Sequence, residues 1–134
     1  MWSSALACLA TAVYFEARGE PLEGQFAVAE VILNRVDSAR FPSSICSVVR
    51  QGSSRPNACQ FSYTCDGKPE VVHEREAFAR AGKIARLMID GRDRALTSGA
   101  KYFHATYVRP SWSRVFTRTA TIGRHHFYSQ TASR

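Results

Sequence analysis

Hydrophobic and polar positions follow a helical pattern in the first two thirds of this chain and a strand-like pattern in the last third. A nearly unbroken apolar run predicts a helix from about residue 4 to residue 18, with Ser3 or Ser4 as its N-cap. A second helix is expected from Pro21 to about residues 35–37, because its apolar residues recur at helical spacing and bury one face.

Residues 37–69 have the composition of turns and loops, with one short helix expected near residues 45–50. A third long helix is predicted from about residue 69 to residue 90, where Gly91 ends it. From residue 100 onward, β-branched and aromatic residues predict two or three short antiparallel strands. We place these strands near residues 100–105, 114–122 and 125–129. Helices followed by a sheet indicate the α+β class.

The length of 134 residues suits a single domain, 1–134, with a core from about residue 5 to residue 129. The longest apolar run, residues 5–15, is too short to span a bilayer, so we expect no membrane segment. This run also lacks the basic residues that open a signal peptide, and we interpret it as a core helix. Any export signal of the natural protein is expected to have been removed from this sequence.

Charge is distributed unevenly along the chain. The first 93 residues hold all 11 acidic residues and balance them with basic ones, whereas residues 94–134 hold seven basic residues and no acid. The net charge of +7 therefore comes from the last part of the chain. Such a segment suits a polyanionic partner, which can be nucleic acid, anionic lipid or an acidic cell-wall polymer; the alternative is a solvated basic face.

The four cysteines, an even number in a small domain, indicate two disulfides and an oxidising compartment. None of them forms the C-x2-C pair that a zinc site favours. Three pairings are possible. We favour Cys59–Cys65, which closes a short loop, together with Cys8–Cys46, which ties the first helix to the connection after the second. The alternative is four reduced thiols, with Cys8 packed in the core.

Glu16 is the most informative residue, because it lies at the end of an almost wholly apolar helix, next to a predicted C-cap at Gly19. Apolar neighbours and the negative end of the helix dipole both raise the pKa of a carboxyl group. A carboxylic acid that stays protonated near neutral pH can act as the general acid in glycoside cleavage. The alternative is a partly buried carboxylate paired with Arg18 or another arginine.

Short motifs follow one another in a characteristic order along residues 5–129. They are YFEARGEP (14–21), GQFAVA (24–29), NRV (34–36), FP (41–42), ICSVV (45–49), CQFS (59–62), DG (66–67), GAKYF (99–103) and IGRHHFY (122–128). This order resembles the SleB/CwlJ-type bacterial cell-wall hydrolases. The spacing of the cysteines and the segment YVRPSW (107–112) look like a Gram-negative, non-sporulating branch of that family.

This resemblance implies a peptidoglycan-degrading catalytic domain with a fold related to lysozymes and lytic transglycosylases. The catalytic glutamate of the family maps onto Glu16. Glu20 is the rival, but it lies beside Pro21 and is expected to face water. The resemblance further implies peptidoglycan strands as the partner, no nucleic acid, no cofactor and no metal. We expect a monomer that acts in the periplasm or outside the cell.

The implied reaction is cleavage of the β-1,4 bond between N-acetylmuramic acid and N-acetylglucosamine, with Glu16 as proton donor. Most glycosidases need a second carboxylate, and the sequence offers four weak candidates, which are Glu20, Glu23, Glu30 and Asp66. We interpret Glu30 as structural and Asp66 as a turn residue. The lack of an obvious partner favours a lytic transglycosylase over a hydrolase.

Seven further residues are candidates for sugar binding, each with a structural alternative. The Cys59–Cys65 loop offers an amide, a ring and a hydroxyl, although its ring can belong to the core. Tyr102 and His104 lie on the same face of a predicted strand and are expected to line the cleft, although Tyr102 can equally pack inward. The indole of Trp112, in a predicted loop, can stack on a sugar or anchor the core. His125, in the last motif, can act as a base or form a hydrogen bond with the backbone. These candidates are Gln60, Phe61, Ser62, Tyr102, His104, Trp112 and His125.

Two other functions compete with this interpretation. The first is an amidase that cuts the lactyl–peptide bond, a class that usually needs zinc. His125 and His126 are adjacent and point to opposite faces of a strand, which disfavours a metal cage. The second is a binding module without catalysis, for cell wall or nucleic acid, but no nucleic-acid motif accompanies the basic segment.

Overall fold

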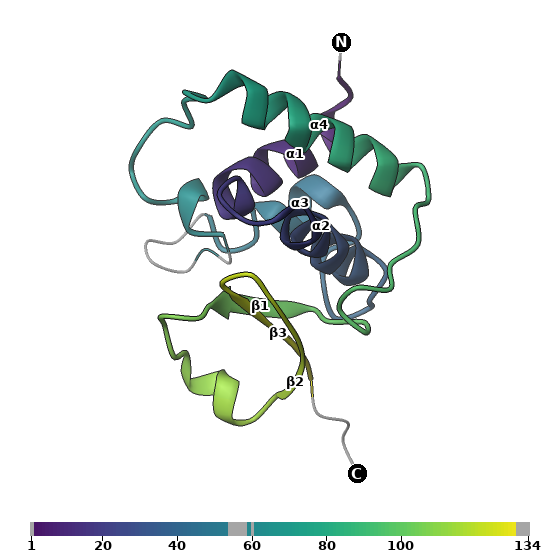
Figure 1. Ribbon diagram of the computed structural model, residues 1–134, viewed down its shortest axis with the longest axis vertical. Coiled ribbons are helices and arrows are strands. Elements are labelled where there is room, and N and C mark those ends of the chain that lie inside the picture. Colours follow the sequence, from purple (N-terminus) through teal and green to yellow (C-terminus); the bar gives the residue numbers. More distant parts are fainter. Residues whose placement is uncertain (1, 54–58, 60, 131–134) are drawn as a thin grey trace.

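Four α-helices and one three-stranded antiparallel sheet make up the computed structural model, which describes residues 2–53, 59 and 61–130. The helices gather in one lobe, and the sheet forms a second lobe on one side of them (Figure 1). This order confirms the predicted α+β class. The elements are α1 (Ser4–Ala17), α2 (Leu22–Val36), α3 (Ile45–Val49), the 3-10 helix η1 (Ser62–Thr64), α4 (Arg75–Ile89), β1 (Tyr102–Ala105), the 3-10 helix η2 (Ser111–Arg114), β2 (Thr117–Ile122) and β3 (His125–Ser129).

Helix α1 is the centre of the helical lobe. It packs against α2, α3 and α4, and most of its residues are buried because few of them are polar. Ser3 caps its N-terminus by accepting a hydrogen bond from the Leu6 amide at 3.2 Å, and Ser44 caps α3 in the same way. These elements, like α2, end within one or two residues of the predicted bounds.

Helix α4 starts six residues later than the sequence predicts, at Arg75 instead of residue 69. The cause lies in α1, where the hydroxyl oxygen of Tyr14 accepts hydrogen bonds from the amides of His73 (3.2 Å) and Glu74 (3.1 Å). This contact holds the end of the preceding segment against α1. The strand predicted over residues 114–122 likewise begins only at Thr117, because η2 occupies residues 111–114.

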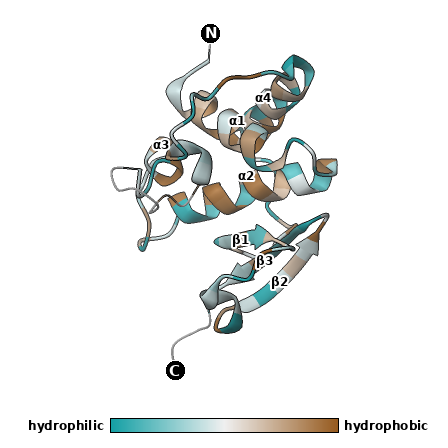
Figure 2. Ribbon diagram, turned by 90° about the vertical axis from the view of Figure 1, so that its left-hand side faces the viewer, coloured by the Kyte–Doolittle hydropathy of each residue, from teal (hydrophilic) through white to brown (hydrophobic). Residues whose placement is uncertain are grey.

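The sheet has the strand order β1-β3-β2, so the last strand is the central one. In the register of β1 and β3, Phe103 lies opposite Phe127 and Ala105 lies opposite His125. The side chains of Phe103 and Phe127 pack with Ala27 and Val31 of α2. Figure 2 shows the sheet set against this side of the helical lobe. The chain therefore has a helical core and a smaller core between α2 and the sheet.

Buried polar side chains of α2 attach the segment that leads into β1. Glu30 is fully buried, and its carboxylate accepts hydrogen bonds from the amides of Leu96 (3.1 Å) and Thr97 (2.7 Å) and from the Thr97 hydroxyl. The carbonyl groups of Ala100 and Lys101 accept hydrogen bonds from α2 side chains one turn further along. The structural role that the sequence suggested for Glu30 is confirmed.

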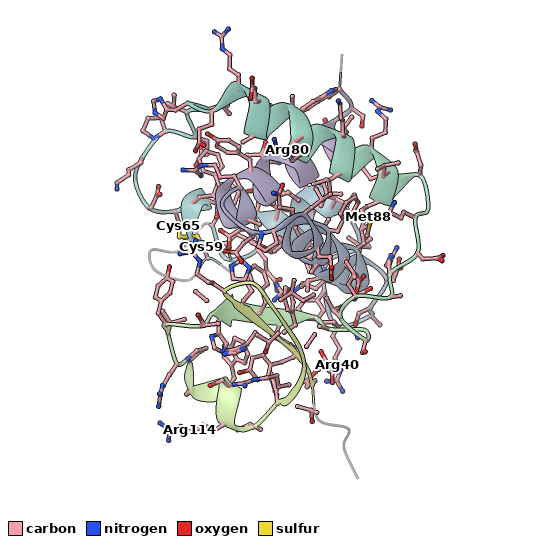
Figure 3. All side chains as sticks on the ribbon, viewed as in Figure 1. Arg40, Cys59, Cys65, Arg80, Met88 and Arg114 are labelled. Atoms are coloured by element: carbon pink, nitrogen blue, oxygen red, sulfur yellow. A yellow bond between two sulfur atoms is a disulfide. The ribbon has the colours of Figure 1, made fainter. Side chains whose placement is uncertain are left out.

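The cysteines pair as Cys8–Cys46 and Cys59–Cys65, which is the pairing favoured from the sequence. The first bond joins α1 to α3, and the second closes a loop at the side of the helical lobe that is visible in Figure 3. In the part of the chain that the structure describes, no helix combines the length and the apolar character needed to cross a membrane.

We expect the Cys8–Cys46 bond to contribute more to stability than Cys59–Cys65, because it closes a loop of 38 residues instead of 6. Loop-closure entropy gives about 4 kcal/mol for the longer loop and about 2 kcal/mol for the shorter one. Urea denaturation followed by circular dichroism can compare the double variants Cys8→Ser/Cys46→Ser and Cys59→Ser/Cys65→Ser. A greater loss in the second variant would contradict this expectation.

Candidate active site

The last turn of α1 delivers Glu16 to the junction of the two lobes. The helix ends at Ala17, where Arg18 is the C-cap and its amide donates to the Tyr14 carbonyl oxygen at 3.2 Å. Gly19, which the sequence predicted as the C-cap, follows the cap and does not have a positive φ angle. A Cβ atom there would lie 3.8 Å from the guanidinium of Arg124, an ordinary contact distance, so the space at this position does not require glycine.

Glu16 lines a pocket of about 320 Å³ whose walls come from both lobes. The helical lobe contributes the end of α1 and the residue before α4, and the sheet lobe contributes the end of β1 and the start of β3. The described lining residues are Phe15, Glu16, Ala17, Arg18, Gly19, Glu20, Glu74, Ala105, Tyr107, Arg124 and His125. Two larger pockets lie elsewhere on the molecule, and Glu16 lines neither of them.

Burial raises the pKa of Glu16 to about 7. No hydrogen bond or ion pair to its carboxyl group is seen within the described residues. The two arginines that line the pocket have other partners, since Arg18 pairs with Glu74 and Arg124 pairs with Glu20. The alternative of a Glu16–Arg18 pair is therefore wrong. A large fraction of Glu16 is protonated at neutral pH, as a general acid requires.

Tyr63 is a buried neighbour of Phe15 and lies close enough to Glu16 for the two ionisable groups to interact. Its ring stacks on Phe15 with 4.9 Å between the centroids, and it is buried. The pKa of Tyr63 is raised, first by burial and then by the nearby charge of Glu16. Its hydroxyl consequently stays protonated in the same pH range in which Glu16 titrates.

Glu20 does not face water, which corrects the prediction from the sequence. Its side chain is only 7% exposed, and one carboxylate oxygen accepts a hydrogen bond from the Arg124 amide at 2.8 Å. The other oxygen lies 3.5 Å from the Arg124 Nε atom. The prediction missed this contact because it depends on a turn about a hundred residues further along the chain.

The other carboxylates named from the sequence lie outside the pocket. Glu30 is committed to the buried contacts of α2, and Asp66 accepts the Lys68 amide at 2.9 Å within an exposed turn. Glu23 is exposed on the first turn of α2. Glu74, which no sequence pattern singled out, does line the pocket, where it pairs with Arg18.

His125 lines the pocket from the sheet lobe and is buried. Burial is the main cause that lowers its pKa, so the imidazole is neutral at neutral pH. Its Nδ1 atom is buried and has no hydrogen-bond partner among the described residues. The expectation that this histidine holds backbone is thus not met, and its neutral ring forms part of the wall beside Glu16.

Tyr102, His104 and Trp112 lie together but not in the pocket. His104 stacks on Tyr128, to whose hydroxyl oxygen its Nε2 atom is 2.9 Å away, and the Trp112 ring lies across both. Tyr102 packs against Trp112 and Phe116. Alternation along β1 puts Tyr102 and His104 on the face opposite Phe103 and Ala105. Tyr102 and His104 do not line the Glu16 pocket, and their contact with a sugar chain stays a prediction, whereas Trp112 packs in an aromatic cluster.

The Cys59–Cys65 loop divides its candidates. Phe61 is 1% exposed and contacts Phe103, so the structural alternative holds and its proposed contact with sugar is wrong. Ser62 is exposed at the start of η1 but does not line the Glu16 pocket. Gln60 lies outside the described residues.

Two further residues lie at the mouth of the pocket, of which Tyr107 was not singled out as a site residue from the sequence. Tyr107 follows β1 and is 82% exposed, and the Arg124 side chain in the β2–β3 turn is 72% exposed. The available signal for Tyr107 was its place in the YVRPSW segment, which the sequence analysis had already noted. Within the described residues, no three His, Cys, Asp or Glu side chains are grouped to hold a metal ion.

Residues 19–128 match the Cell Wall Hydrolase family. The chain belongs to this family. As a cell wall hydrolase it is similar to the spore cortex-lytic enzymes of Oceanobacillus iheyensis (36% identical over 119 residues) and Bacillus cereus (35% over 119 residues). Each alignment covers 89% of this chain but only 39% and 42% of those relatives, so the chain spans about two fifths of their length.

Solved structures agree with the family. The catalytic domain of the germination-specific lytic transglycosylase SleB from Bacillus anthracis matches this cell wall hydrolase with a TM-score of 0.69 and 32% identity. The catalytic domain of the Bacillus cereus SleB protein matches with a TM-score of 0.71 and 35% identity. Both matches cover 96% of this chain and more than nine tenths of the solved chain. The predicted fold class is thereby confirmed.

The raised pKa of Glu16 makes the stability of the wild type depend on pH. Between pH 4.5 and 7 the folded state keeps a proton that the unfolded state has released, so the free energy of unfolding falls as pH rises. Glu16→Gln removes this penalty, and we expect the variant to be more stable than wild type by at most about 3 kcal/mol at pH 8 and equal to it at pH 4.

Urea denaturation at several pH values measures this difference, with Glu23→Gln on exposed α2 surface as control. The titration of His125 affects all three proteins alike and cancels in the comparison. A Glu16→Gln variant that is no more stable than wild type at pH 8 would contradict the burial argument.

Proposed function

We propose that this chain cleaves the β-1,4 bond between N-acetylmuramic acid and N-acetylglucosamine in peptidoglycan, as a lytic transglycosylase. The observation that supports this proposal is the Glu16 carboxyl group, whose pKa is raised by burial to about 7, in a pocket between the two lobes. The similar proteins, which include a lytic transglycosylase and spore cortex-lytic enzymes, agree with it. We further propose that residues 1–134 act as one catalytic domain.

The reaction begins when the Glu16 carboxyl group donates its proton to the bridging oxygen. The bond between this oxygen and C1 of the muramyl sugar breaks, and an oxocarbenium-like sugar forms. The Glu16 carboxylate then takes the proton of the muramyl 6-hydroxyl group, whose oxygen attacks C1. A 1,6-anhydro ring closes, Glu16 is protonated again, and no water is consumed.

The pocket supports transglycosylation over hydrolysis. A hydrolase of the usual kind needs a second carboxylate that is free to activate water or to attack the sugar. Glu20 and Glu74 line the pocket, but each is already paired with an arginine. Glu16 is the carboxyl group of this pocket that has no such partner within the described residues, so it acts both as acid and as base.

The proposed substrate and the two disulfides favour a location outside the cytoplasm. Peptidoglycan lies there, and the two disulfides suit an oxidising compartment such as the periplasm. We propose a monomer whose partner is the glycan strand and not nucleic acid. The basic residues of the sheet lobe suit the carboxylates of muramyl lactyl groups and stem peptides; Arg114, for example, extends away from the lobe in Figure 3.

Purified sacculi digested by wild type are expected to release fragments with 1,6-anhydro ends, which mass spectrometry identifies by the loss of one water. Glu16→Gln keeps the shape of the side chain but cannot donate the proton, so turnover should fall at least about 100-fold. The exposed variant Glu76→Gln on α4 serves as control. Fragments with ordinary reducing ends would show that the enzyme is a hydrolase and would contradict transglycosylation. Full activity of Glu16→Gln would overturn the proposal.

The pH dependence of kcat/KM should follow the protonated form of Glu16. Activity is expected to decline above a midpoint near pH 7, because the acid then loses its proton before substrate arrives. Initial rates on soluble glycan fragments between pH 5 and 9 measure this midpoint. A profile that stays flat up to pH 9 would contradict the assignment of Glu16 as general acid.

A further inference from the structure

Glu20, the second acid of the motif around Glu16, forms a buried contact between the helical lobe and the β2–β3 turn. Its carboxylate accepts the amide hydrogen of Arg124 at 2.8 Å and lies 3.5 Å from the Nε atom of the same residue. Glu20 contributes an almost fully buried side chain, whereas the Arg124 side chain is 72% exposed. The shorter contact is the hydrogen bond from the Arg124 backbone amide, and it does not depend on the exposed Arg124 side chain.

The turn itself is shaped to approach this carboxylate. Gly123 has a φ angle of +58°, in the left-handed region that favours glycine. A Cβ atom at this position would lie 2.3 Å from the Glu20 Oε1 atom and 2.8 Å from the Pro21 Cδ atom. No other side chain fits there without moving the turn away from Glu20.

Glu20 is held in place from the helical side. Its amide donates to the Ala17 carbonyl oxygen at 2.9 Å, and its own carbonyl oxygen accepts a hydrogen bond from the buried side chain of Gln25 at 3.0 Å. On the sheet side, the carbonyl oxygen of Arg124 accepts the Thr106 amide at 2.9 Å. The contact thus extends from the end of α1, through the turn, to the segment that carries Tyr107.

We propose that Glu20 is a positioning residue that closes the sheet-lobe wall of the Glu16 pocket. It holds the turn, and with it Arg124 and His125, against the end of α1, and so keeps water away from the Glu16 carboxyl group. This inference rests on the proposed function for its catalytic consequence. The motif then uses two acids for different purposes, since Glu16 exchanges a proton while Glu20 fixes the wall beside it.

A test must separate this role from a simple effect of charge. The titratable groups that share the pocket with Glu16 are Arg18, Glu20, Glu74, Tyr107, Arg124 and His125, and Tyr63 lies close to Glu16. Glu20→Ala removes both the acceptor and the charge, whereas Glu20→Gln removes the charge and keeps an acceptor oxygen. Gly123→Ala displaces the turn and leaves the charge of Glu20 in place.

Amide hydrogen exchange measures the contact directly and without substrate. We expect exchange at Arg124 and His125 to become at least about tenfold faster in Glu20→Ala and Gly123→Ala, and to stay near wild type in Glu20→Gln and in the exposed control Glu23→Ala. Wild-type exchange in both Glu20→Ala and Gly123→Ala would overturn the proposal, whether or not the enzyme acts on peptidoglycan.

The pH profile of kcat/KM tests the consequence for Glu16. A loosened turn admits water to the Glu16 carboxyl group. The alkaline midpoint of kcat/KM should therefore move from near 7 toward 4.5 in Gly123→Ala, which keeps the Glu20 carboxyl group. It should also move further in Glu20→Ala than in Glu20→Gln. Equal shifts of the midpoint in the two Glu20 variants, with no shift in Gly123→Ala, would show that Glu20 acts on Glu16 through its charge and does not position the turn. Failure of the proposed function looks different, because wild type would then lack activity or Glu16→Gln would keep it.

Discussion

Buried hydrogen bonds between α2 and the segment that leads into β1 fix the two lobes to each other, and the pocket depends on this attachment. The Glu30 carboxylate is fully buried, which is tolerable because it accepts the amides of Leu96 and Thr97. These bonds set where β1 begins, and Phe103 then packs into the core against α2. The sheet can therefore present its turn to the end of α1. The shape of the pocket between the lobes therefore depends on contacts of Glu30 and Phe103, which lie outside the pocket.

The end of α1 gives two acids of one motif opposite environments. Glu16 lies in the last helical turn, among apolar side chains, and has no hydrogen-bonding partner within the described residues. Glu20 lies four residues later, after the helix has ended, where it turns toward the backbone of Arg124. Burial without a partner raises the pKa of the first carboxyl group, whereas burial with an amide donor makes the second a structural contact. The distinction between a reacting and a positioning acid comes from the point at which the helix stops.

Local physics explains which features could be predicted from the sequence. The environment of Glu16 was predictable because its apolar neighbours lie on its own helix, and the strand alternation predicted that Tyr102 and His104 share a face, which is confirmed. Periodicity does not tell which face of a strand meets the helices, so it could not place these two side chains relative to the Glu16 pocket, which neither of them lines. The burial of Glu20 and the late start of α4 at Arg75 depend on long-range hydrogen bonds that no local pattern encodes.

The central claim is that folding keeps one carboxyl group protonated near neutral pH at the junction of the lobes. Nuclear magnetic resonance of the side-chain carboxyl carbon of Glu16, followed from pH 3 to 9 in the free protein and assigned with Glu16→Gln, measures this most directly. The account predicts a titration midpoint near pH 7. A midpoint near 4.5, the value of a solvated glutamate, would contradict it.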